Sequence, residues 1–242
     1  MGKKVLKNFN IFWLFIFFLL FVGRITLIFA GDGCQINSDK NVHYVIIDPL
    51  GRKTGFDPIT NKWYEEIPGA NYGSSGVNEN YSHEFGTSAD NPPIEGLYQI
   101  KVIGVTHGKY SIGIYFLRGH KHITTNIEGV TDSSSVSYCQ FTYNSNPDSA
   151  IKLERIVNSC SDIRQDLDLC YKIGWITNKD IYNSLSKKID NAEKQADKGK
   201  SKTATNNLNA FINEVDAQRD KHITKDAAVI LVEDAEALIR KW

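Results

Sequence analysis

The sequence predicts an α+β protein with two domains, an antiparallel β-sandwich followed by a small antiparallel helical bundle, after an N-terminal signal or anchor helix. Three observations predict this. Short runs of alternating apolar residues occupy much of the first half of the chain, two amphipathic helices lie in residues 173–223, and an apolar run lies near the start. We place the signal or anchor at residues 1–30, the sandwich at 35–144 and the helical domain at 150–242.

The N-terminal segment has the three parts of a secretory signal. Lys3, Lys4 and Lys7 precede an unbroken apolar run over residues 11–23, and a small residue, Ala30, follows. Thirteen helical residues cover about 20 Å, which is less than the ~30 Å of a hydrocarbon core. We therefore expect a cleaved signal and an exported protein. The alternative is a retained single-pass anchor over residues 11–29, which would then be the protein's only contact with a membrane.

The charge of the exported part argues against a nucleic-acid ligand. The whole chain has 28 basic and 28 acidic side chains. Without the four basic residues of the first 30, 24 basic and 28 acidic side chains remain, a net charge of −4. Nucleic-acid binding requires a basic surface, so we expect no nucleic-acid partner.

The sandwich is predicted from short strands with turn residues between them. Gly104 to Gly108 is expected to be a hairpin turn between two alternating strands in the stretch Gly96–Phe116. Asp48–Gly73 is rich in Gly, Pro, Asn and Asp and is expected to be a long structured loop. The other expected strands are Val42–Ile47, His122–Ile127 and Val136–Tyr143.

Four helices are predicted after a polar linker at Asn144–Ser149. The first traces an apolar face from Leu153 to Gly174. The two middle helices break at Gly199, where glycine can take a positive φ, and they should bury their apolar faces against each other. Thr224 can cap the last helix, and the short loops imply antiparallel neighbours.

Two stretches resemble known families. Ser184–Ala192 reads SLxxKIxxA and Asn206–Ile223 reads NxLNAFINEVxAQRxKxI. Both resemble the FIMAH domain, a small helical domain found towards the C-terminal end of secreted bacterial proteins. The pattern Gly-x-Tyr-x-Ile-x-Val-x-Gly followed by Gly-x-Tyr-x-Ile, from Gly96 to Ile112, is similar to the pre-peptidase C-terminal sandwich modules of secreted bacterial peptidases. These resemblances imply an accessory role and carry no catalytic residue.

Three sets of residues in the β region are candidate sites. Asp48, Asp57 and Asn61 could supply oxygen ligands to calcium, although turn formation is the favoured explanation for these residue types. Trp63, Tyr64, Tyr72 and Tyr81 could form an aromatic platform for a sugar or peptide, or could fix the long loop to the sandwich. Cys34 and Cys139 lie near the two ends of the β region and could form a disulfide if the first and last strands are neighbours.

No catalytic motif accompanies these residues. The patterns GxSxG, HExxH, GxGxxG and the P-loop are all missing from the sequence. We expect a non-catalytic exported module that binds a protein or polysaccharide at the bacterial cell envelope and needs no cofactor, apart from calcium as a weak alternative. The other hypothesis is a small metal-dependent or hydrolytic enzyme with its site in the Asp48–Tyr81 loops.

Overall fold

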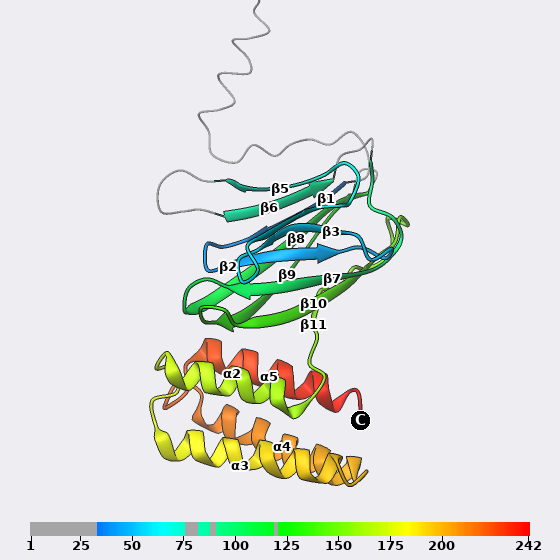
Figure 1. Ribbon diagram of the computed structural model, residues 1–242. Helices are drawn as coiled ribbons and strands as arrows, with labels where there is room; N and C mark the ends of the chain where they lie inside the picture. The colour runs from blue at the N-terminus through cyan, green and yellow to red at the C-terminus, as the bar shows by residue number, and fades with distance from the viewer. Residues whose placement is uncertain (1–32, 76–81, 88–90, 119–120) are drawn as a thin grey trace, which may run out of the picture.

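The computed structural model describes residues 33–75, 82–87, 91–118 and 121–242 (Figure 1). The predicted signal or anchor at residues 1–30 lies outside these residues. Within the part of the chain that is described, no helix has the length and apolar character needed to cross a membrane. The described residues form two antiparallel sheets followed by four helices, which confirms the predicted fold class.

The two sheets contain five and six strands. All strand pairs are antiparallel. The first sheet has the order β5 (Ala70–Ser75), β6 (Ser82–Thr87), β1 (Gly33–Ser38), β8 (Gly108–Arg118) and β9 (Lys121–Thr131). The second has the order β11 (Glu154–Arg155), β10 (Val136–Tyr143), β7 (Gly96–Gly104), β2 (Val42–Ile47), β3 (Lys53–Asp57) and β4 (Lys62–Glu65).

A core of alternate side chains fills the space between the sheets. Each central strand contributes every second residue, as a half-buried strand should. The rings of Tyr98 and Phe141 stack at 5.0 Å, and Phe116 of the opposite sheet meets Phe141 edge-on at 5.4 Å. Further fully buried members are Ile36, Tyr44, Ile46, Ile100, Ile112, Ile114 and Tyr143.

The structure corrects the predicted loop over Asp48–Gly73. This stretch contains β3, β4 and the start of β5, and β3 and β4 form a hairpin. The turn between them ends at Asn61, which takes a positive φ of 52°. Asparagine tolerates this conformation better than most residues. These strands are only four to six residues long, so their alternation is too brief to stand out among the turn residues.

The structure also corrects the predicted hairpin at Gly104–Gly108. β7 pairs with β2 and β10, whereas β8 pairs with β1 and β9, so the connection crosses from one sheet to the other. Both strands bury alternate residues in the same core, and the sequence pattern of a hairpin and of a crossover is therefore the same. Gly104 is closely packed at this crossover: a Cβ there would lie 2.0 Å from the carbonyl oxygen of Asp132.

Four helices follow the sandwich: α2 (Cys160–Lys172), α3 (Lys179–Ala196), α4 (Ser201–Gln218) and α5 (Lys225–Ile239). The break between α3 and α4 falls at Gly199, with a φ of 68°, as predicted. Thr224 caps α5 by accepting a hydrogen bond from the backbone N–H of Ala227. Ala192, Leu208 and Phe211 from the facing stripes of α3 and α4 are completely buried.

The first helix begins later than the sequence predicts. Residues from Leu153 onward were expected to be helical, but Glu154 and Arg155 form β11 and the helix begins at Cys160. Leu153 packs in the sandwich core, whereas Val157 packs in the bundle core. The apolar residues of this stretch thus serve two separate cores, and their spacing resembles a helical face only by coincidence.

The bundle lies at one end of the sandwich, with α2 and α5 nearest the sheets and α3 and α4 farther away (Figure 1). Val130 of β9 belongs to the buried core of the bundle. The segment between β10 and β11 is held by the buried side chain of Arg118. This side chain donates hydrogen bonds to the carbonyl oxygens of Asn144 at 2.5 Å, of Asn146 at 2.6 Å and of Ser149. The predicted polar linker is therefore tied to the sandwich.

Candidate functional site

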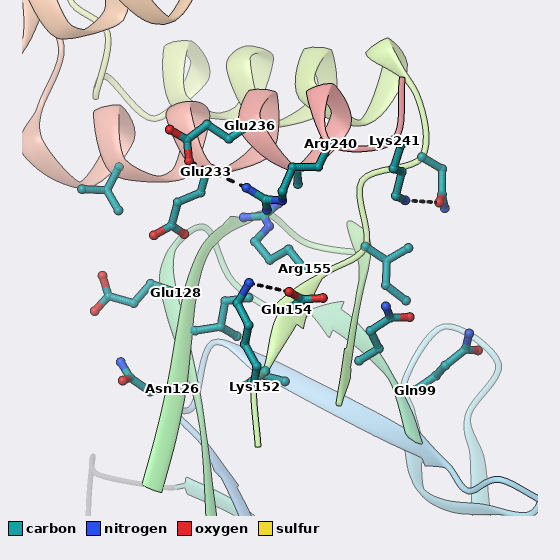
Figure 2. Close-up of a pocket in the computed structure, with 17 residues that line it drawn as sticks. Gln99, Asn126, Glu128, Lys152, Glu154, Arg155, Glu233, Glu236, Arg240 and Lys241 are labelled. Carbon is teal, nitrogen blue, oxygen red and sulfur yellow. Dashed lines mark hydrogen bonds and ion pairs between the residues drawn. The ribbon is translucent and has the colours of Figure 1, made fainter. Parts of the chain in front are cut away.

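A groove of about 860 Å³ opens where the sandwich meets the bundle. We call it the junction groove. Its walls are β9 and the segment around β11, and α5 forms its roof (Figure 2). Its volume lies in the range of ligand sites, and domain junctions are frequent positions for such sites. Its lining residues are Gln99, Asn126, Ile127, Glu128, Gln140, Lys152, Leu153, Glu154, Arg155, Ile156, Asn158, Val229, Glu233, Glu236, Ala237, Arg240 and Lys241.

Charges are distributed unevenly along the groove. Figure 2 shows Glu128, Glu233 and Glu236 at one end and Lys241 at the other. Lys241 is engaged at its end, where its Nζ donates to Val157 O at 2.6 Å and to Asn158 Oδ1 at 2.8 Å. The groove therefore has an acidic end, defined by Glu128, Glu233 and Glu236.

Two of the three acidic-end carboxylates have basic neighbours. Glu128 lies 2.8 Å from Lys109 Nζ, and Glu236 lies 3.9 Å from Arg240 on the exposed surface of α5. Glu233 makes no ion pair among the described residues. Partial burial raises the pKa of Glu233, and Arg155 and Arg240 offset this only in part. Glu233 is thus the carboxylate of the groove whose charge is least compensated.

A buried ionic cluster of Arg155, Asp166 and Asp234 lies behind the groove. Arg155 comes from β11, Asp166 from α2 and Asp234 from α5, so the cluster joins the sandwich to two helices. Arg155 Nε lies 3.0 Å from Asp234 Oδ1, and Arg155 Nη2 pairs with Asp166. The side chains are only 9%, 3% and 1% exposed, respectively. Such a cluster fixes the relative position of the elements that carry it, because moving one would leave a buried charge unpaired.

The cluster contains one positive and two negative groups. Burial raises the pKa of Asp234 well above its usual value, the guanidinium of Arg155 opposes this shift, and the charge of Asp166 adds to it. Burial alone would lower the pKa of Arg155, but the two carboxylates raise it. Asp234 therefore holds its proton to a higher pH than an exposed carboxyl does.

Two further ion pairs connect the sandwich to the helices. Lys109 of β8 reaches Asp226 at the start of α5, with 3.1 Å between Nζ and Oδ1. Lys172 at the end of α2 pairs with Asp132, which follows β9. Together with the buried cluster, these pairs connect α2 and α5 to the sheets.

The predicted calcium ligands are engaged elsewhere. Asp48 accepts hydrogen bonds from the backbone of Leu50 and Arg52 and from Arg52 Nε at 2.7 Å. Asp57 accepts hydrogen bonds from the backbone N–H groups of Ile59 and Thr60, in the turn that follows it, and from Lys101 Nζ at 2.8 Å. Both carboxylates thus fix turns and face cations. Among the residues described, no three His, Cys, Asp or Glu side chains come together in a way that could hold a metal ion.

The predicted aromatic platform is brought together only in part. Trp63 is 57% exposed, and its ring lies 4.7 Å from that of Phe56 and 5.9 Å from that of Tyr72. Tyr64 follows Trp63 on a strand and so faces the other side, where Lys53 and Lys62 lie over its ring. Tyr81 lies outside the described residues.

The reason for expecting a Cys34–Cys139 disulfide is wrong. Cys34 lies on β1 and Cys139 on β10, and these strands belong to different sheets and do not pair. All four cysteines are buried free thiols in the structure. Cys160 and Cys170 lie on one helix, α2, as expected.

The sequence did not lead us to the groove or the ionic cluster, although one signal was present. Asp166 falls three residues after Ile163, on the apolar stripe of α2, and Asp234 falls three residues after Leu231 on that of α5. A carboxylate on an apolar stripe indicates a buried partner. Arg155 carried no such signal, because its segment was interpreted as helix.

The comparisons with known proteins concern only the helical part. No curated protein matches the chain significantly. The expected similarity of the sandwich to pre-peptidase C-terminal modules stays a prediction. The last third of the chain, residues 160–240, matches the family model described as the FIMAH domain, and this is the part that forms α2 to α5.

Proposed function

We propose that this protein is a non-catalytic accessory module that acts outside the cytoplasm, at the bacterial cell envelope or in the medium, by binding a protein or polysaccharide in the junction groove. The groove carries the proposal. It has the volume of a ligand site, lies between two domains and is lined by charged and amide side chains that can form directed hydrogen bonds.

The ion pairs of Lys152, Glu154 and Arg155 support binding rather than acid–base chemistry at these three side chains. Lys152 pairs with Glu154 at 2.5 Å, and Arg155 is held by two carboxylates behind the groove wall. A general acid donates a proton to the substrate and a general base accepts one, whereas these side chains are engaged in ion pairs with carboxylates or with each other. The FIMAH match in residues 160–240 also favours an accessory role.

The N-terminal pattern supports export. Lys3, Lys4 and Lys7 precede the apolar run of residues 11–23, and Ala30 offers a small residue for cleavage. The intact mass of the protein from its producing cells tests this part. A mass that starts at Gly31 supports a cleaved signal, and a full-length mass supports the retained anchor over residues 11–29.

Blocking the groove tests the proposed site. Two substitutions fill the groove from different sides: Ala237→Trp from the roof formed by α5 and Asn126→Trp from the wall formed by β9. The control is Ala217→Trp on the exposed surface of α4. The labelled full chain and each variant are applied to an array of bacterial envelope polysaccharides and an array of synthetic peptides. Circular dichroism and thermal unfolding confirm that each variant is folded.

We expect wild type and Ala217→Trp to bind the same array members, and both groove variants to lose at least about tenfold in affinity. Binding that survives both groove variants would place the ligand elsewhere. The absence of binding by wild type to either array would contradict the proposed function itself.

A further inference from the structure

The groove lies beside two strand edges. β9 is the outermost strand of one sheet and β11 of the other, as far as the described residues extend. Ile156 N–H donates to Tyr138 O at 2.8 Å, which directs the N–H and C=O of Ile156 toward β10. In an antiparallel pair the direction alternates, so the N–H and C=O of Arg155 point away from β10. An extended peptide can use such an edge for backbone hydrogen bonds.

One hydrogen-bond donor of the Arg155 side chain also has no partner among the described residues. This side chain lines the groove and is more than nine-tenths buried, and among the described residues its buried Nη1 has no hydrogen-bond partner, as is also true of the carboxylate oxygens of Asp234. Figure 2 shows this side chain rising from β11 toward α5, between the acidic end and Lys241. A buried donor without an acceptor is costly, and a peptide carbonyl is a suitable acceptor for a guanidinium.

The acidic end supplies the second half of the recognition. Lys109 lies beside Glu128 and Arg240 beside Glu236, whereas Glu233 makes no ion pair among the described residues and is only partly compensated by Arg155 and Arg240. One cationic group would complete this end of the groove. None of the groove-lining residues is aromatic, whereas aromatic side chains provide the flat apolar surface on which a sugar ring would rest.

We propose that the junction groove binds an extended peptide whose backbone follows the strand edge at Arg155 and whose Lys or Arg side chain occupies the acidic end beside Glu233. This rests on the proposed function and names the ligand class for the same site. The cationic side chain gives direction to the bound peptide, because only one end of the groove is acidic. The backbone contacts are independent of the peptide's other side chains.

Three labelled probes test the two halves of this proposal. The first is acetylated and amidated Thr-Val-Thr-Lys-Thr-Val-Thr, the second has norleucine in place of Lys, and the third is the Lys peptide with alternate backbone amides methylated. Affinities are measured by fluorescence anisotropy with the full chain. The protein variants are Glu233→Gln and a matched control, Glu65→Gln on β4, at the opposite edge of the six-stranded sheet.

We expect the Lys peptide to bind at least about fivefold more tightly than the norleucine peptide, and added salt to reduce this difference. Glu233→Gln should bring the ratio of the affinities for the Lys and norleucine peptides close to one, while Glu65→Gln should leave this ratio unchanged. The methylated peptide should bind weakly, since it cannot donate to a strand edge. Equal binding of the Lys and norleucine peptides, or no binding of either, would overturn the proposal.

These outcomes separate the inference from the proposed function. A polysaccharide, or a peptide without a basic side chain, that binds wild type and is lost in Ala237→Trp would overturn the inference and leave the groove as the binding site. A Lys peptide that binds Ala237→Trp as well as wild type would contradict both.

Discussion

Replacing Arg155 by Met should destabilise the protein strongly, because it leaves two buried carboxylates without their cation. Asp166 and Asp234 are only 3% and 1% exposed, and Arg155 Nε lies 3.0 Å from Asp234. When Asp234 is ionised, unit charges at this separation attract by about 5.5 kcal/mol at an effective dielectric constant of about 20. Part of that is offset because Met avoids the desolvation of a guanidinium. Removing one partner of a buried ion pair costs about 3–5 kcal/mol, which is the loss we expect.

Guanidinium denaturation at neutral pH measures this loss. Circular dichroism follows the whole chain, and tryptophan fluorescence adds a signal from Trp175 and Trp242, which pack on the bundle core, together with the other two tryptophans. The exposed neighbour Lys152→Met is the matched control and should change the free energy of unfolding by less than about 0.5 kcal/mol.

A triple variant tests the cause of the loss. Adding Asp166→Leu and Asp234→Leu to Arg155→Met removes every charge of the cluster, and apolar replacements of buried ion clusters are often neutral or stabilising. We therefore expect the triple variant to recover most of the lost stability. A loss below about 1 kcal/mol in Arg155→Met, or a triple variant less stable than the single one, would refute the argument from uncompensated charge.

Three further predictions follow from burial. Burial raises the pKa of Asp234 above its usual 3.8, so the folded state binds this proton more tightly than the unfolded chain does. This contribution is complete below the unfolded pKa and is lost as pH rises through the folded pKa. In thermal unfolding from about pH 4 to about pH 8, wild type should therefore lose stability relative to Asp234→Asn, and parallel curves would contradict this. Phe211→Ala should cost about 3–5 kcal/mol in denaturant unfolding because Phe211 is fully buried, whereas the exposed Asn213→Ala should cost less than about 0.5 kcal/mol. Burial raises the pKa of the Cys139 thiol to about 12, so native protein should resist iodoacetamide. Unfolding without reductant should expose all four thiols, and mass spectrometry that finds only two alkylated thiols would show that a disulfide is present and contradict this prediction.

Long, regular patterns were predictable from the sequence. The first and last residues of β2 and β10 are those of the predicted strands Val42–Ile47 and Val136–Tyr143. The break between α3 and α4 falls at Gly199, as predicted. In each case the local signal and the packing agree, because the alternating or helical apolar face is also the buried face. The strands β3 and β4 were missed because they are short, the buried residues of β3 are Thr54, Gly55 and Asp57 and thus not large apolar ones, and β4 at the sheet edge has no buried residue.

The sequence alone determined the bounds of β2 and β10 and the buried apolar faces of α3, α4 and α5, because alternation, helical periodicity and capping are local in sequence. It could not determine which strands pair, since β7 and β8 have the same pattern whether they form a hairpin or belong to opposite sheets. The junction groove and the cluster of Arg155, Asp166 and Asp234 were decided only by the tertiary structure. They draw on β11, α2 and α5, and α5 comes much later in the chain than the other two elements, so the three meet only because the last helix packs back against the sandwich.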